Sequence, residues 1–207
     1  MSLLPPIKNL EFFEDLHRYR LNGQWLARSV TGVVGHDMPA KTRERIDATK
    51  DQWLPRGLAI HAALEAFLLG QPQPDPGEFE PWVTALLADD IWKGAEVLAV
   101  EYRLCDERKS LAGSFDFLIR TARGNVVLGD LKGVSSSVAA QSRKPATEQL
   151  GAYLAMLIDH HPTLTVNKCV TVVAGPGVVR KKANEPDECL GAWIDCWDRY
   201  QLLQPDF

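Results

Sequence analysis

Apolar residues recur with two different periods along this chain, and each period predicts its own kind of element. A period of two, broken by short polar connections, runs through 97–120 and 125–132 and predicts three consecutive antiparallel strands. A period near 3.6 predicts a helix over 56–70, with a buried stripe of Ile60, Leu64, Phe67 and Leu68. The same period predicts a helix over 146–159, with a stripe of Leu150, Leu154, Leu157 and Ile158.

Turn signals and weaker patterns complete the prediction. Asn22-Gly23 lies between two short apolar runs in 15–31 and predicts a β-hairpin. We expect further helices over 37–54, 81–92 and 187–203, a strand over 164–174, a polar loop over 135–147 and a basic loop over 175–186. With no repeat or linker, this pattern favours a single α/β domain over 1–207, in which helices flank a central mixed sheet.

Composition adds few constraints. The chain has 207 residues, of which 45% are hydrophobic, and a formal net charge of −4, so no global basic field indicates a nucleic-acid partner. The N-terminus lacks a signal-peptide pattern and no apolar run approaches bilayer length, so we expect no membrane association. Four widely spaced cysteines are typical of free thiols in a reducing cytoplasm.

Candidate chemistry is concentrated in the stretch 111–133. Asp116 lies inside one predicted strand, and Asp130 and Lys132 end the next. Carboxylates within apolar strands are costly unless a cation compensates them, and Mg²⁺ or Mn²⁺ prefers such oxygen ligands. The backbone carbonyl of Leu131 and the imidazole of His61 can extend this ligand set, and Lys132 can stabilise negative charge that develops beside the metal.

Two helices carry paired side chains that we expect beside this site. His61 and Glu65 are four residues apart and project from one flank of the helix over 56–70. Gln149 and Tyr153 repeat that spacing on the helix over 146–159. Taken alone, His61 is equally explained as a hydrogen-bonded structural histidine, and Tyr153 as a packing residue.

These elements resemble, in their order, the PD-(D/E)XK nuclease superfamily and its RecB-like branch, which includes phage recombination exonucleases. The resemblance is carried by 56–61 (RGLAIH), by Asp116, by Asp130-Leu131-Lys132 and by 149–153 (QLGAY), although Ser114-Phe115 replaces the usual proline before the first aspartate. It implies a restriction-endonuclease-like fold, catalytic roles for Asp116, Asp130, Lys132 and Gln149, and metal ligation by His61, Asp116, Asp130 and Leu131, with Glu101 as an additional acidic candidate.

The resemblance also implies a DNA exonuclease that uses Mg²⁺ or Mn²⁺ in recombination, repair or phage DNA metabolism, in the cytoplasm of a bacterial or phage-infected cell. A homo-oligomer or a recombination protein is a further expected partner. No cysteine cluster for iron and sulfur and no GxxxxGK[ST] phosphate loop for ATP occur in the sequence. A structure-selective endonuclease, an inactive DNA-binding module and an assembly protein of the same fold stay open as alternatives.

Expected DNA contacts come from side chains around these motifs. They are Arg56, Ser114, Ser135, Ser136, Arg143, Lys144 and Tyr153, with the basic run 180–182 as a further candidate. The serines of 135–137 are equally consistent with plain loop residues, and the basic run with a solvated surface.

Overall fold

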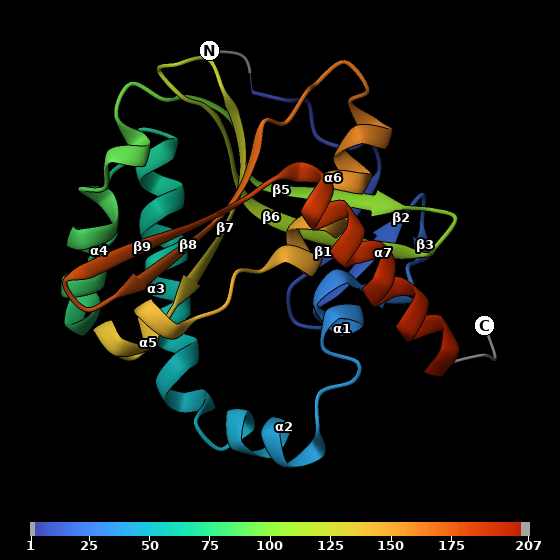
Figure 1. Ribbon diagram of the computed structural model, residues 1–207, viewed down its shortest axis with the longest axis horizontal. Helices are drawn as coiled ribbons and strands as arrows, with labels where there is room; N and C mark the ends of the chain where they lie inside the picture. The colour runs from blue at the N-terminus through green and yellow to red at the C-terminus, as the bar shows by residue number, and fades with distance from the viewer. Residues whose placement is uncertain (1–2, 204–207) are drawn as a thin grey trace.

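A six-stranded mixed sheet forms the centre of the computed structural model, which describes residues 3–203 (Figure 1). Its strand order is β4-β6-β7-β8-β9, with β5 paired to β6 on the other side. The strands are β4 (Arg28–Ser29), β5 (Glu96–Asp106), β6 (Leu111–Arg120), β7 (Val126–Gly133), β8 (Lys168–Gly175) and β9 (Val178–Asn184). The pairs β5–β6, β6–β7 and β8–β9 are antiparallel, whereas β7–β8 and β4–β6 are parallel. The three antiparallel strands expected from the sequence are confirmed.

Helices cover both faces of this sheet. On one face, α3 (Lys50–Leu68) and α4 (Glu80–Leu87) share a buried cluster with Val127 and Leu131 of β7. On the other face, α6 (Thr147–His160) and α7 (Pro186–Leu203) share a separate cluster with Val126 and Leu128. This alternation along β7 is what a strand buried on both faces requires. The predicted α/β class, with a mixed sheet flanked by helices, is therefore confirmed.

Short elements connect these layers. They are α1 (Val30–Val34), α2 (Ala40–Asp47), α5 (Ser137–Ser142) and the 3₁₀ turns η1 (Gly77–Phe79) and η2 (Asp90–Trp92). No helix within residues 3–203 has the length and apolar character needed to cross a bilayer. All four cysteine side chains are buried and free.

The expected N-terminal hairpin is present and belongs to a small antiparallel sheet of β1 (Leu10–Phe13), β2 (Arg18–Leu21) and β3 (Gln24–Trp25). Both residues of its turn, Asn22 and Gly23, have positive φ, as a type I′ hairpin turn requires. One face of the sheet packs Tyr19 and Leu21 against β5 and β6. The hairpin prediction is therefore confirmed, with β1 as an added strand.

Several predicted boundaries are wrong. Helix α3 begins at Lys50 and runs through Pro55, although proline inside a helix loses a hydrogen bond and usually ends it. The predicted helix over 37–54 is accordingly two pieces, α2 and the first turns of α3. The expected stripes also include two exposed side chains, Phe67 and Ile158. Because helix packing selects a narrower face than the 3.6-residue period indicates, these two residues fall outside it.

Two predicted loops contain regular structure. The basic segment predicted as a loop over 175–186 is largely β9, an edge strand that pairs with β8 along its whole length. Charged residues are common on edge strands because they discourage pairing with another chain, so a basic run does not exclude a strand. The polar segment 135–147 likewise contains α5, whose first turn is capped by the Ser136 hydroxyl.

The alternation of side chains between the two faces of the sheet is interrupted on β5 and β6, at the positions of the acidic residues. Residues two apart on a strand normally share a face, yet Phe115 belongs to the α6–α7 cluster and Phe117 to the α3–α4 cluster. The change falls at Asp116 and, on β5, at Glu101, which has a φ of 44°. A regular strand would put Asp116 and Leu118 on one face, but Leu118 packs in the α6–α7 cluster while Asp116 faces α3.

Candidate metal centre and cleft

The candidate site occupies a gap between β6 and β7. These strands pair only from Phe117 to Arg120 on β6, and β4 pairs with the same edge only at Leu111 and Ala112. Between these segments, the Asp116 carboxylate accepts a hydrogen bond from the Leu131 backbone N–H of β7. An acidic side chain thus takes the place of a ladder partner, and this hydrogen bond fixes one carboxylate oxygen in the gap between the two strands.

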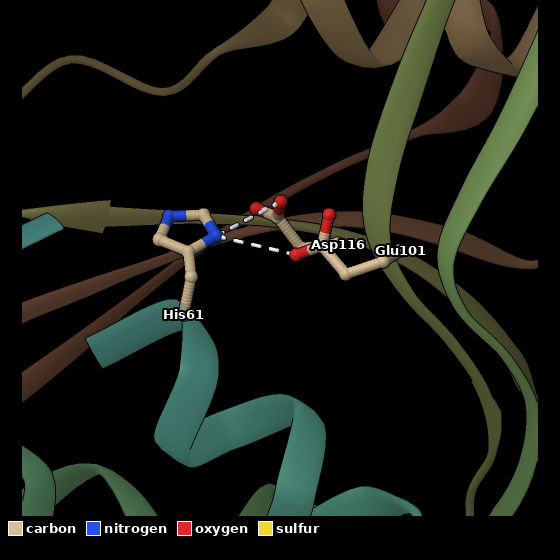
Figure 2. A group of neighbouring side chains, drawn as sticks. All are labelled: His61, Glu101 and Asp116. Atoms are coloured by element: carbon tan, nitrogen blue, oxygen red, sulfur yellow. Dashed lines mark hydrogen bonds and ion pairs between the residues drawn. The ribbon is translucent and has the colours of Figure 1, made fainter. Parts of the chain in front are cut away.

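Three side chains from three elements converge at this gap (Figure 2). His61 of α3 has its Nδ1 3.3 Å from Oδ1 of Asp116 on β6 and 3.4 Å from Oε1 of Glu101 on β5. One ligand atom from each lies within 4.8 Å of the others. Burial alone would lower the pKa of His61, but the two carboxylates raise it well above the usual 6.5. Burial raises the pKa of Asp116, but His61 and Lys132 outweigh it and hold that pKa below the usual 3.8.

Glu101 reaches this cluster through an unusual backbone. Its φ of 44° lies in the left-handed region, which costs a non-glycine residue on the order of 1–3 kcal/mol. The neighbouring pairs, Val100 with Phe117 and Tyr102 with Phe115, place Glu101 directly opposite Asp116. The structure therefore brings Glu101, the additional acidic candidate, next to His61, and its backbone there has the left-handed conformation.

A second group of side chains adjoins the first. Lys132 Nζ donates to Asp130 Oδ1 at 3.0 Å and to Gln149 Oε1 of α6 at 2.9 Å. Gln149 Nε2 in turn donates to the Tyr153 hydroxyl at 3.0 Å. The aromatic ring of Tyr153 passes so close to Gly113 that a Cβ there would lie 2.7 Å from it. The expected pairs on α3 and α6 thus reach the gap from opposite layers of the fold.

Asp130 is the most constrained carboxylate of this group. It is 1% exposed, and its Oδ2 is buried without a hydrogen-bond partner. Burial raises the pKa of Asp130 to about 6, although the ion pair with Lys132 opposes that shift. A buried carboxylate oxygen without a donor is costly unless a proton, a water or a cation satisfies it.

The residues present fit a hard divalent cation. His61, Glu101 and Asp116 offer one nitrogen and two carboxylates, and Asp130, which lines the same cleft, has an unpartnered oxygen. The N–H and C=O of one strand residue point toward the same neighbour, so the Leu131 carbonyl is directed at the same gap. The compact cluster differs from the expected ligand set, because Glu101 joins His61 and Asp116 whereas Asp130 pairs with Lys132.

A cleft of about 650 Å³ opens above these groups. Its floor contains the three carboxylates Glu101, Asp116 and Asp130. It also contains Lys132 and Ser114, and the Ser114 Oγ is buried without a partner. Its walls come from the helix α3, from the N-terminal sheet with its β1–β2 turn, and from β5, which supplies Arg103; the other wall residues are Phe12, His17, Tyr19, Trp53, Leu54 and Leu58. None of these wall residues was singled out from the sequence; the exposed apolar side chains on the flank that carries His61 were the available signal.

The expected DNA-contact residues are distributed unevenly. Arg143 and Lys144 line a second hollow of about 430 Å³, which meets the cleft at Lys132 and Gln149. Arg56 does not line the cleft, and burial lowers the pKa of its guanidinium. Ser135 is exposed outside the cleft, and Ser136 uses its hydroxyl to cap α5.

The basic run on β9 is partly occupied within the fold. Lys181 pairs with Asp89 at 2.7 Å, and the side chains of Arg180 and Lys182 bond to Gln141 of α5. These contacts tie β9 to its neighbours, and the Asp89 carboxylate offsets the charge of Lys181, whereas Gln141 is neutral and leaves the charges of Arg180 and Lys182 in place.

Comparison with known proteins yields little. No family model and no curated protein matches the chain. Among solved structures, the crystal structure of SSO0001 is similar with 18% sequence identity and a TM-score of 0.40, over 84% of this chain and 75% of that one.

Proposed function

We propose that this protein is a metal-dependent deoxyribonuclease that hydrolyses phosphodiester bonds, acting as an exonuclease. The observation that carries the proposal is the convergence of His61, Glu101 and Asp116 beside the Asp130–Lys132 pair on the floor of one cleft. Such a mixed imidazole and carboxylate set suits Mg²⁺ or Mn²⁺. The resemblance of the surrounding motifs to the PD-(D/E)XK superfamily supports the same activity.

Each side chain has a distinct part in this proposal. A bound divalent cation would polarise a phosphate oxygen and lower the pKa of an attacking water. His61, Glu101 and Asp116 would hold it, and the Leu131 N–H fixes the direction of the Asp116 carboxylate. Lys132 is held by hydrogen bonds to Asp130 and Gln149, and it would present its ammonium group to the phosphate as negative charge develops on the phosphate oxygens.

A digestion assay tests the proposal. Linear and closed circular DNA are incubated with the protein and Mg²⁺ or Mn²⁺, with and without chelator. We expect linear DNA to be degraded only with the metal, and Lys132→Ala to lower the rate by roughly 10²-fold or more, as loss of a transition-state donor does. Lys93→Ala is the matched control, because Lys93 is exposed and forms an ion pair with its neighbour Asp90.

The outcomes separate the alternatives. Cutting of closed circles would indicate an endonuclease in place of an exonuclease. Metal-independent binding of DNA without cutting would indicate an inactive DNA-binding module. Degradation that persists at the full rate in Lys132→Ala would refute the catalytic assignment.

A further inference from the structure

The cleft has apolar walls that a site for phosphate chemistry alone does not need. On α3, Leu54 and Leu58 continue the stripe that carries His61 and Glu65, and they are 37% and 59% exposed. The neighbouring indole of Trp53 is held in place by a hydrogen bond of 2.9 Å from its Nε1 to the Ile46 carbonyl. This wall therefore presents fixed apolar surface directly above the acidic floor.

The second wall belongs to the N-terminal sheet and is aromatic. The ring of Phe12 lies 4.7 Å from that of Tyr19 and 5.3 Å from that of His17. The guanidinium of Arg103 lies 5.4 Å from the centre of the Phe12 ring, within the range of a cation–π contact. All four residues line the cleft. Aromatic rings interleaved with a cation are the surface on which nucleic-acid bases stack.

The form of nucleic acid that fits such walls follows from base accessibility. A duplex stacks its bases internally and shows only their edges in its grooves, so it offers no base face to an aromatic wall. A single strand exposes those faces. The volume of about 650 Å³ lies in the range that encloses a small organic ligand, which suits a few unstacked nucleotides rather than the body of a duplex.

We propose that the cleft binds a single-stranded DNA end, with unstacked bases held between the Phe12 wall and the Leu54–Leu58 wall. The backbone of that strand then lies over the floor of the cleft, which contains Lys132. Arg103, which also lines the cleft, supplies a second positive charge for the phosphates. This inference rests on the proposed nuclease function and specifies the form of its substrate.

Binding measurements in chelator test the inference without cleavage. Fluorescence anisotropy compares a single-stranded oligonucleotide, the corresponding blunt duplex and the same duplex with a single-stranded overhang. We expect the single strand and the overhang to bind more tightly than the blunt duplex. Phe12→Leu keeps an apolar side chain against Tyr19 but removes the aromatic face, and we expect it to weaken single-strand binding roughly 5- to 100-fold, as loss of one base-stacking partner does.

A matched control lies on the same small sheet. Trp25 pairs with Arg20, which pairs with Glu11, so it projects from the face opposite to Phe12 and Tyr19. It is 41% exposed and does not line the cleft. We expect Trp25→Leu to leave the affinity for single strands unchanged. Leu58→Ser supplies a second cleft variant, because so exposed a side chain contributes little to folding, and we expect it to weaken binding as well.

The two proposals fail in different ways. If the protein cuts DNA but binds single strands and blunt duplexes equally, and Phe12→Leu and Leu58→Ser change nothing, the inference is overturned and the nuclease function stands. If no DNA is cut under any metal condition, the nuclease function is overturned. A 2-aminopurine base at the strand end gives an independent readout: we expect its fluorescence to be quenched by stacking in the wild type and that quenching to be lost in Phe12→Leu.

Discussion

Replacing Asp130 with asparagine is expected to stabilise the metal-free protein while it abolishes activity. Asp130 is 1% exposed, and one of its oxygens has no hydrogen-bond partner. Its ionised form is therefore poorly solvated in the folded chain, even with Lys132 3.0 Å away. Asparagine has nearly the same shape and keeps an oxygen that can accept the Lys132 hydrogen bond, but it carries no charge.

The magnitude follows from the pKa of this carboxyl. Burial raises it from 3.8 to about 6, and a shift of that size corresponds to about 3 kcal/mol. Because the folded pKa is raised, the folded chain holds the proton more tightly than the unfolded chain does. Protonated Asp130 therefore adds to the free energy of unfolding. This contribution is fully present below pH 3.8, is lost as the pH rises toward about 6, and is absent at pH 7.5.

Urea unfolding in chelator measures this effect. At pH 7.5 we expect the free energy of unfolding of Asp130→Asn to exceed that of the wild type by up to about 3 kcal/mol, which corresponds to roughly 6–12 °C in Tm. At pH 5.0 the difference should shrink to roughly half, because the wild-type carboxyl is then mostly protonated in the folded chain.

The control is Asp195→Asn on the exposed surface of α7, which we expect to change stability by less than about 0.5 kcal/mol. Equal or lower stability of Asp130→Asn at pH 7.5 would refute the reasoning. A difference between the variant and the wild type that does not change with pH would refute it too.

Three further predictions address packing, metal binding and positioning. Gly151→Ala should destabilise the fold by roughly 1–3 kcal/mol or more in thermal unfolding, because its Cβ would lie 1.9 Å from the Cys189 carbonyl oxygen of α7. Gly191→Ala, also helical but with open space around it, should instead stabilise by about 0.5–1 kcal/mol. Equal effects of the two would contradict the packing of α6 on α7. Mn²⁺ affinity measured by calorimetry should rise with pH through neutrality, because the raised pKa of His61 makes the metal compete with a proton, and His61→Asn should flatten that dependence and weaken binding. A steep dependence retained in His61→Asn would exclude His61 as the competing group. Gln149→Ala should lower kcat by roughly 10- to 100-fold with little change in KM, since Gln149 orients Lys132 and lies away from the apolar walls. A change confined to KM would point to a role in substrate binding instead.

Much of the fold follows from local sequence patterns. The two-residue period and short connections were enough to predict that β5, β6 and β7 are consecutive antiparallel strands. Asn22-Gly23 was enough to predict the hairpin. These features depend on neighbouring residues, so a sequence window contains the whole physical cause. The same local reasoning missed β9 and began α3 six residues late, because strand pairing and helix packing there override local preference.

For the candidate site, the sequence by itself determined which side chains are chemically capable. Asp130 and Lys132 are two apart on a strand, a spacing that puts them on one face, and they form an ion pair. Gln149 and Tyr153 are hydrogen-bonded because they are one helical turn apart. Both relations arise within one element, so neither needed the tertiary structure.

Only the tertiary structure decided how these groups meet. The gap where β6 leaves β7, the left-handed backbone at Glu101 and the change of side at Asp116 bring carboxylates from two strands to the imidazole of α3. The apolar walls likewise come from segments far apart in sequence, α3 and the N-terminal sheet. Strand divergence and layer packing are set by long-range contacts, and no local period encodes them.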